Sequence, residues 1–245
     1  MITFNEERNI ERCLASVQDV ADEVVVVDSF STDQTKAICQ KYGVRFLEHD
    51  FVGHIQQKNW AWSQATCDYV LSLDADEALT PELKESIAKV KEQPDFQGYT
   101  MNRLTYYCGH WVKHSGWYPD TKLRLFKKGK GAWGGVNPHD KFMMNKVQKT
   151  PNLRGDLLHY SYYSKEDHFK QIEYFSAIAA KELYDKGKRV STATIWLKMA
   201  AQFVKNFILK TGFLDGGTGW LIATRSSYAT LRKYSKLKEL HEKGS

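Results

Sequence analysis

The sequence predicts an α/β fold in which helices alternate with the strands of a mixed, mainly parallel sheet. The run Val24–Val27 has the β-branched composition of a strand that is buried on both faces. Residues 10–17 before this run and residues 35–42 after it have the apolar spacing or caps of helices. This alternation over the first 80 residues indicates repeated βαβ units.

Polar residues follow the predicted strands where each strand ends. A short first strand ends at Asn5, and the valine strand stops at Asp28. A further strand, residues 69–73, is followed by Asp74. In an open α/β sheet, ligands bind outside the carboxyl ends of the strands. We therefore expect Asn5, Asp28 and Asp74 to converge at one edge.

The remaining elements follow from caps and apolar periodicity. Gly43 ends the second helix, and Thr80-Pro81 opens a later one. The predicted elements are a strand over residues 44–47, helices over 55–65 and 81–90, strands over 99–106 and 121–126, and helices over 165–186 and 194–209.

The charge distribution favours an anionic partner. The formal net charge is +6, and the basic residues gather in segments 122–149 and 181–243. No zinc-ligand spacing, RNA-binding signature or recognition-helix pattern accompanies them. We therefore expect no nucleic-acid partner, although lysines that merely solvate helix faces give the same pattern.

The cysteines and the hydropathy predict an intracellular location. Cys13, Cys39, Cys67 and Cys108 form no CxxC pair, which indicates reduced thiols. No apolar run reaches the ~18 residues of a spanning helix, and no signal-peptide pattern is present. We expect a cytoplasmic protein that works in the cytosol or at the inner face of the cytoplasmic membrane.

The acidic turn Asp74-Ala75-Asp76 is the main candidate for chemistry. It follows the apolar strand over residues 69–73 and precedes Glu77. Two adjacent carboxylates repel each other unless a cation holds them, and hard divalent ions prefer oxygen ligands. Mn²⁺ or Mg²⁺ at this turn would stabilise a departing diphosphate. Acidic turns are common, so the prediction of a metal site here depends on the apolar strand that precedes the turn.

The chain resembles family 2 glycosyltransferases of the GT-A fold. Within that family it is most similar to lipopolysaccharide core enzymes, the β-1,4-glucosyltransferase subgroup that adds glucose to a heptose. The similar stretches are ITFNEE at residues 2–7, EVVVVDSFSTDQT at 23–35, Lys58-Asn59, DYVLSLDADE at 68–77, LRLF at 123–126 and GFLDG at 212–216. Relatives have several more residues in the first strand, and Ser29 stands where many carry a second acidic residue.

The resemblance implies a UDP-sugar donor and a glycan or glycolipid acceptor. It implies that the nucleoside contacts Thr3, Phe4, Asn5 and Glu6, that the uracil ring contacts Asp28, and that Lys58, Asp74, Ala75 and Arg124 lie at the donor. Mn²⁺ or Mg²⁺ would bind Asp74, Asp76 and His159. His159 can equally be a buried core histidine, and Arg124 can pair with a neighbouring carboxylate instead of phosphate.

Family 2 enzymes of this kind invert the anomeric centre, so a carboxylate must deprotonate the acceptor hydroxyl. Asp140, which follows His139, matches the position where many relatives carry Glu after His, and we predict it as the base. Asp120 is the alternative. Because it follows Pro119, it can also be an ordinary turn residue.

The C-terminal part is predicted to be helical and basic. The helix over residues 194–209 interleaves lysines with aromatic and aliphatic residues, which favours peripheral membrane contact or packing on the catalytic domain. With the resemblance, we predict a catalytic domain over residues 1–190 and an extension over 191–245. The nucleotide-sugar half would cover about 1–95 and the acceptor half about 96–190.

Two other functions are compatible with this architecture. A sugar nucleotidyltransferase would carry a glycine-rich loop after the first strand, where this chain has Asn5-Glu6-Glu7. A non-catalytic carbohydrate-binding protein could keep the fold, but it would not need the acidic turn together with a candidate base. The sequence therefore favours a metal-dependent hexosyltransferase, with glucose as the expected sugar.

Overall fold

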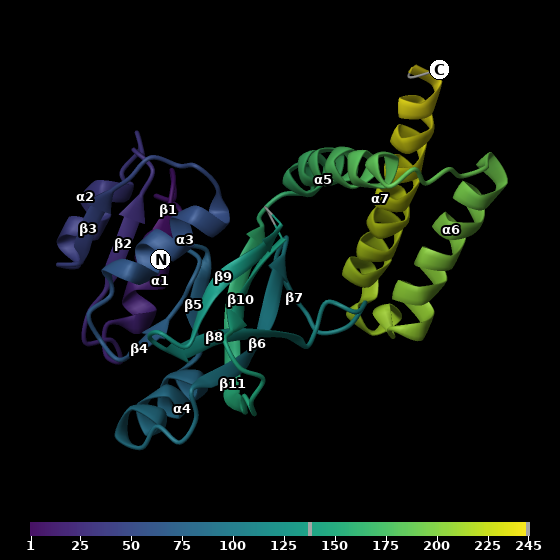
Figure 1. The fold of residues 1–245 in the computed structure, drawn as a ribbon. Helices are drawn as coiled ribbons and strands as arrows, with labels where there is room; N and C mark the ends of the chain where they lie inside the picture. Colours follow the sequence, from purple (N-terminus) through teal and green to yellow (C-terminus); the bar gives the residue numbers. More distant parts are fainter. Residues whose placement is uncertain (137–138, 244–245) are drawn as a thin grey trace. The chain divides into compact units, whose positions relative to one another are not determined.

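In the computed structural model, which describes residues 1–136 and 139–243, the first three strands form a parallel sheet (Figure 1). Their order is β1-β2-β3, and the register pairs Thr3 with Asp28 and Asp28 with Glu48. This confirms the predicted βαβ units. The elements are β1 (Ile2–Thr3), α1 (Ile10–Val17), β2 (Val25–Asp28), α2 (Thr35–Lys41), β3 (Arg45–Glu48) and α3 (His54–Gln64).

A second, six-stranded sheet has the order β4-β8-β6-β11-β5, and β7 pairs with β6. The registers β4–β8, β6–β8, β6–β7 and β5–β11 are antiparallel, so parallel pairing is concentrated in β1–β3. The strands are β4 (Tyr69–Leu71), β5 (Glu77–Leu79), β6 (Gly98–Tyr107), β7 (His110–Val112), β8 (Asp120–Lys127) and β11 (Asn152–Tyr162).

Short connections explain the antiparallel pairing of two strand pairs, β6–β7 and β9–β10. Parallel neighbours need a crossover of a dozen residues or more, whereas a hairpin needs only a few. Cys108 and Gly109, both at positive φ, join β6 directly to β7. A second hairpin pairs β9 (Gly131–Val136) with β10 (His139–Met144) and sets Asp140 opposite Gly135.

The chain groups into two compact units. Unit 1 comprises Met1–Arg103 and Asp120–Tyr160, and unit 2 comprises Leu104–Pro119 and Ser161–Ser245. The boundaries expected near residues 95 and 190 stay a prediction about functional domains.

The core of unit 1 is built around α1. Ile10 and Leu14 pack with Val26 of β2, whereas Cys13 and Val17 pack in a second cluster with Leu157 of β11 and with α4 (Pro81–Glu92). Both buried faces of this short helix are therefore covered. Because α1 touches strands of both sheets, it fixes the acidic turn between them.

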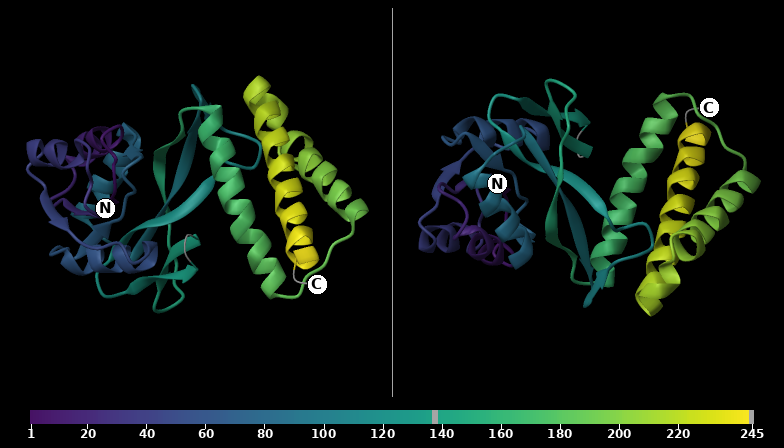
Figure 2. Two further views of the ribbon diagram at one scale, coloured as in Figure 1. Left: turned by 90° about the horizontal axis from the view of Figure 1, so that it is seen from above. Right: turned by 90° about the horizontal axis from the view of Figure 1, so that it is seen from below.

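Unit 2 contains three long helices. In both views of Figure 2, α7 lies between α5 and α6, and it packs against each of them. The predicted helices near residues 165–186 and 194–209 are confirmed. Nowhere in residues 1–136 and 139–243 does a helix have the length and apolarity to cross a membrane. The elements are α5 (Lys165–Asp185), α6 (Thr192–Val204), η1 (Lys205–Leu209), η2 (Gly212–Asp215) and α7 (Gly216–Lys243).

His168 of α5 is buried in an aromatic cluster of unit 2. Its Nδ1 lies 2.9 Å from the hydroxyl of Tyr107, and the rings of Trp117 and Tyr162 pack against it. Burial, with a smaller contribution from Arg225, lowers the pKa of His168 to about 4. The imidazole is therefore neutral in the folded protein at pH values where an unfolded histidine already carries a proton.

This shift predicts acid sensitivity. Between pH 6.5 and about 4, the unfolded chain binds a proton that folded His168 does not bind, so stability falls as the pH falls. We expect His168→Gln to remove up to about 3 kcal/mol of this pH-dependent loss. Urea midpoints measured at several pH values test it. The control is His54→Gln at an exposed position, and an unchanged pH slope in His168→Gln would contradict the assignment.

Candidate active site at the end of strand β4

The acidic turn is closed by its own hydrogen bonds. The backbone amide of Asp74 donates to Oε2 of Glu77, and the Glu77 amide donates to the Asp74 carbonyl, each at 3.0 Å. Ala75 points into the core beside Ile10, and the Cys13 thiol lies 3.6 Å from the Asp74 carbonyl. The carboxylates of the turn are therefore held on a fixed backbone.

Asp74 is clamped between two cations. Its Oδ1 lies 3.0 Å from Lys58 Nζ, and its Oδ2 accepts a hydrogen bond of 2.7 Å from Arg124. Burial opposes ionisation of Asp74, but Arg124 and Lys58 outweigh it and hold the pKa of this carboxyl well below its usual range. Asp74 is therefore a permanent anion that positions two cations.

Arg124 also binds Glu77, at 2.6 Å from Oε1. Burial, with a contribution from the Asp74 charge, raises the pKa of Glu77, although Arg124 acts in the opposite direction. The guanidinium of Arg124 is itself 5% exposed, so a single buried cation serves two carboxylates. Arg124 thus pairs with two neighbouring carboxylates, and its contact with a donor phosphate stays a prediction.

The same pairing continues to both candidate bases. Lys58 lies 2.9 Å from Asp140, whose side chain is 9% exposed. At the other side, Arg103 lies 3.5 Å from Glu77 and 2.7 Å from Asp120, whose side chain is 32% exposed. We call the whole set the ion-pair chain. Its members, in spatial order, are Asp140, Lys58, Asp74, Arg124, Glu77, Arg103 and Asp120.

The two candidate bases differ in their surroundings. Burial works against ionisation of Asp120, but Lys122 and Arg103 lower its pKa. Asp120 therefore contacts two cations, which hold its proton affinity down. Asp140 pairs with Lys58, whose ammonium also lies 4.5 Å from the centre of the Trp133 ring.

Asp76 and His159 lie side by side. The β5–β11 register pairs Glu77 with His159, and the Tyr160 amide donates to the Asp76 carbonyl at 2.9 Å. This places His159 Nε2 3.2 Å from Asp76 Oδ2. The Asp76 side chain is 26% exposed, so it can contact solvent or a ligand.

The residues at this point fit a divalent cation that is shared with a ligand. Within residues 1–136 and 139–243 there is no group of three or more candidate metal ligands. Asp76 and His159 supply one carboxylate and one imidazole, which Mn²⁺ accepts, while both Asp74 oxygens face cations. Such ions keep several coordination positions for water and substrate phosphates, so two protein ligands are compatible with the predicted site.

The loops after β1 and β2 are tied together beside this turn. Thr3 Oγ1 donates to Asp28 Oδ1 at 2.9 Å, and Ser31 donates to both Asp28 oxygens through its amide and its hydroxyl. Asn5, at φ 53°, donates its amide to Ser31 Oγ at 2.8 Å. Asp28 is almost completely buried, so contact with a uracil ring requires one of these partners to give way.

Two other residues of the first loop face different surroundings. Phe4 is largely exposed, so its ring is available to a ligand. The Glu6 amide donates to Thr35 Oγ1 at 2.8 Å. Burial raises the pKa of Glu6, its hydrogen bond with Asn9 opposes the shift, and the charges of nearby acids add to it.

Three residues in or beside this site are not indicated by the sequence motifs. The sequence identifies Glu77 only as a neighbour of the acidic turn, and no motif points to Arg103 as a site residue or to Gln57 next to Lys58. Arg103 shares the alternating positions of Tyr99 and Met101, which are buried, and a charge at such a position is a usable signal. Gln57, fully buried, joins His49 to Ser29, but nothing in the local pattern distinguishes it.

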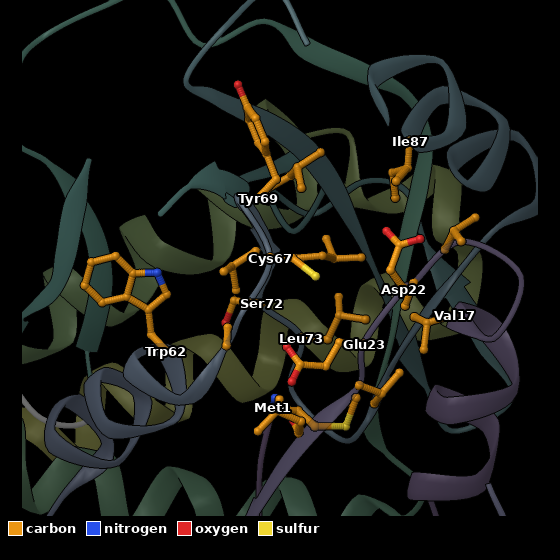
Figure 3. A pocket seen from close by; sticks show the side chains of 18 of the residues that line it. Met1, Val17, Asp22, Glu23, Trp62, Cys67, Tyr69, Ser72, Leu73 and Ile87 are labelled. Carbon is orange, nitrogen blue, oxygen red and sulfur yellow. Dashed lines mark hydrogen bonds between the residues drawn. The ribbon is translucent and has the colours of Figure 1, made fainter. Parts of the chain in front are cut away.

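A cavity of about 310 Å³ in unit 1 adjoins the ion-pair chain, because Lys58 and Trp133 are among its lining residues. Most of its lining is apolar, and it includes Val17 of α1, Tyr69 of β4, Leu73 and Ile87 of α4 (Figure 3). Neither Asp28 nor Asp74 lines it. We therefore place the candidate site at the ion-pair chain and the Asp76–His159 pair, and not in this cavity.

Comparison with known proteins identifies the class. The model of glycosyl transferase family 2 matches residues 1–168, and the chain belongs to this family. The chain is similar to an uncharacterised glycosyltransferase of Rickettsia typhi, with 32% identity over 251 residues that cover 98% of this chain and 86% of that protein. The predicted family is therefore confirmed.

Two further similarities concern the subgroup and the fold. The lipopolysaccharide core biosynthesis glycosyltransferase LpsC of Rhizobium meliloti is 27% identical over 236 residues, 91% of this chain and 87% of LpsC. The mannosyltransferase PcManGT of Pyrobaculum calidifontis, solved with GDP-Man and Mn²⁺, has a TM-score of 0.56 at 16% identity and covers 97% of this chain and 85% of that structure. The predicted GT-A fold class with C-terminal helices is confirmed.

We expect the ion-pair chain to depend on its buried cation. Arg124→Met would remove the cation that Asp74 and Glu77 share, leaving Asp74 with Lys58 and Glu77 with the more distant Arg103, and should lower the free energy of unfolding by about 3 kcal/mol. The loss in free energy of unfolding should be smaller at lower pH, where the carboxyls can bind protons. Urea denaturation at two pH values measures both effects.

The matched control for this prediction is Arg154→Met. Arg154 forms an exposed pair with Glu82 at 3.2 Å, so its loss should cost less than about 1 kcal/mol. Equal effects of the two substitutions would mean that burial of Arg124 does not determine its contribution.

Proposed function

We propose that this protein is a metal-dependent, inverting hexosyltransferase. It moves a hexose, glucose by the resemblance to the β-1,4-glucosyltransferase subgroup, from a UDP-sugar to a lipopolysaccharide-core or other cell-envelope glycan. One observation carries the proposal. Asp76 and His159 lie together at the end of β4, beside an Asp74 that is already neutralised by two cations.

The donor side is supported by the two loops that flank the turn. Phe4 has an exposed ring, and Asn5 and Glu6 hold the backbone of the same loop against the loop after β2. A nucleoside bound here would stack on Phe4, with the diphosphate directed towards Asp76. Asp28 would reach the uracil ring after exchange of its Ser31 contact.

The diphosphate brings additional negative charge to an acidic turn, so a cation must accompany it. Asp76 and His159 would hold Mn²⁺ or Mg²⁺, and Asp74 would act chiefly through Lys58 and Arg124. The metal, when bound, neutralises charge on the departing diphosphate. Lys58 lies between Asp74 and Asp140 and can direct its ammonium to a phosphate oxygen.

The transfer step needs a base for the acceptor hydroxyl. In the proposed step, Asp140 takes the hydroxyl proton as the acceptor oxygen forms a bond to the anomeric carbon. The bond from that carbon to the diphosphate oxygen breaks at the same time, and UDP leaves with the electron pair. Attack from the side opposite the leaving group inverts the anomeric centre. Asp120 is the alternative base.

The acceptor assignment rests on relatives. LpsC of Rhizobium meliloti is named for lipopolysaccharide core biosynthesis, which supports a cell-envelope acceptor for this chain. A glycolipid acceptor of that kind is held in a bilayer. We therefore place the activity in the cytoplasm at the inner face of the cytoplasmic membrane, where a soluble UDP-sugar and a lipid-linked acceptor meet.

Metal-dependent donor binding tests the central assignment. In titration calorimetry with UDP and Mn²⁺, Asp76→Asn should weaken binding at least about tenfold, because the amide lacks the charge that holds the cation. Asp22→Asn is the control, because Asp22 is exposed and does not belong to the acidic turn. Equal affinity of the unmodified protein for UDP with and without a chelator would overturn metal dependence.

The choice of base is tested by a pair of variants. Asp140→Asn keeps an oxygen that can accept from Lys58 but loses the proton acceptor, so transfer should fall at least about 100-fold while UDP affinity changes less than about threefold. Asp120→Asn should retain transfer within about tenfold. The assay follows UDP release with a deacylated core oligosaccharide as acceptor. The reverse ranking would assign the base to Asp120.

A further inference from the structure

The solvent side of α6 and η1 carries apolar side chains where a helix in water normally carries polar ones. Two neighbouring rows with a spacing of four residues form this side, which places them along one face of the helix. The rows consist of Trp196, Ala200, Val204 and Ile208 and, one position later, Leu197, Ala201, Lys205 and Leu209, all of them exposed. Leu197 and Leu209 are 70% and 72% exposed.

The opposite side of the same helix contains polar groups. Asn206 is buried, and Gln202 donates to its Oδ1 at 2.8 Å. On the same side, the Met199 carbonyl accepts a hydrogen bond of 3.1 Å from Ser227 of α7. The helix therefore buries Ile195, an amide pair and a hydroxyl contact, while Leu197, Val204, Ile208 and Leu209 stay outside. Unit 2 does not use those residues for its own core.

The exposed rows continue into the following segments. Trp220, at the start of α7, packs edge-on against Phe203 at 5.1 Å and Phe207 at 5.4 Å, and Phe207 contacts Phe213 of η2 at 6.3 Å. These contacts make one continuous surface, which we call the apolar surface of unit 2. Its large exposed residues are Trp196, Leu197, Val204, Ile208, Leu209, Phe213, Leu214 and Trp220.

The exposed charges of the segment that forms most of this surface are all positive. Between residues 191 and 219 the basic residues are Lys198, Lys205 and Lys210, each exposed. The only acidic residue of that segment is Asp215, which is buried and accepts the amide of His114 at 2.9 Å. An anionic partner therefore meets no exposed carboxylate of residues 191–219.

We propose that the apolar surface of unit 2 docks on an anionic phospholipid bilayer. Its tryptophans, phenylalanines and aliphatic side chains enter the boundary between headgroups and acyl chains, and the three lysines contact headgroup phosphates. Aromatic and aliphatic side chains that insert, together with lysines beside them, favour binding at such a boundary. The inference deepens the proposed function, which needs a lipid-held acceptor, but its evidence is independent of that function.

A second copy of the chain fits this surface less well. A two-fold symmetric contact sets the same patch against itself, so the lysines of one copy would face those of the other without an exposed acid between them. Like charges in such a contact are unfavourable. A bilayer of anionic lipid offers the opposite charge over the whole area.

Vesicle co-sedimentation of the full chain tests the proposal, with no sugar donor present. Phosphatidylglycerol–phosphatidylethanolamine vesicles should bind the unmodified protein, and vesicles of phosphatidylcholine alone should bind it more weakly. Leu197→Ser/Leu209→Ser should reduce the binding to anionic vesicles at least about tenfold, because two inserted aliphatic side chains are lost. Lys198→Glu/Lys205→Glu should reduce it mainly at low salt.

Val52→Ser/Val147→Ser is the matched control, since both valines are exposed in unit 1 and lie outside the apolar surface. It should bind vesicles like the unmodified protein. Circular dichroism checks folding, and Trp196→Ser/Leu214→Ser replaces the leucine variant if that variant unfolds. Unchanged binding of the folded surface variants, or no binding by the unmodified protein, would overturn the proposal.

Light scattering tests whether the apolar surface of unit 2 is instead a contact between two copies of the chain. If the unmodified protein is a dimer and Leu197→Ser/Leu209→Ser is a monomer, the surface is a contact between copies and the bilayer proposal is wrong. Because these measurements need no turnover, a failure of vesicle binding leaves the Asp76 and Asp140 tests unaffected. Loss of UDP binding would likewise leave this proposal standing.

Discussion

The contact between Arg124 and the carboxylates of Asp74 and Glu77 is the interaction on which the site in unit 1 depends. A buried charge needs a partner with good geometry, and this guanidinium has two at 2.7 and 2.6 Å. Glu77 in turn accepts the Asp74 amide and closes the turn. The carboxylates are thus oriented by protein charges before any ligand arrives, which reduces reorganisation on binding.

This arrangement separates the roles of the two aspartates in the acidic turn. Asp74 has a cation on each oxygen, whereas Asp76 lies beside a histidine at 3.2 Å and is partly exposed. Since neighbouring carboxylates repel, neutralising Asp74 from within leaves Asp76 able to recruit an external cation. Sequence spacing treats both residues alike, and only the surrounding charges distinguish them. Asp74 therefore organises the charges of the turn, and Asp76 is the carboxylate that stays accessible beside a histidine.

The sequence predicts most of the N-terminal fold because local patterns decide it. The valine run, the polar residues that end each strand and the helix caps depend on nearby residues. Contacts between residues that are distant in sequence cannot be predicted from such local patterns. Arg103 contacts Asp120 because of the strand register, and Lys58 contacts Asp140 because of the β9–β10 pairing. The buried side of α6 cannot be predicted from the sequence either, because this helix has apolar residues on two sides and periodicity alone does not tell which side is buried.

The apolar surface of unit 2 gives the proposed acceptor chemistry a physical basis. A lipid-held acceptor moves in two dimensions, so an enzyme that binds the same bilayer meets it at a raised effective concentration without any additional contact to the sugar. Individual exposed side chains that insert shallowly give reversible binding, which suits an enzyme that must move between acceptors. Positive flanks add attraction that falls with salt. Under the two proposals, acceptor affinity is divided between sugar recognition at the ion-pair chain and lipid binding by unit 2.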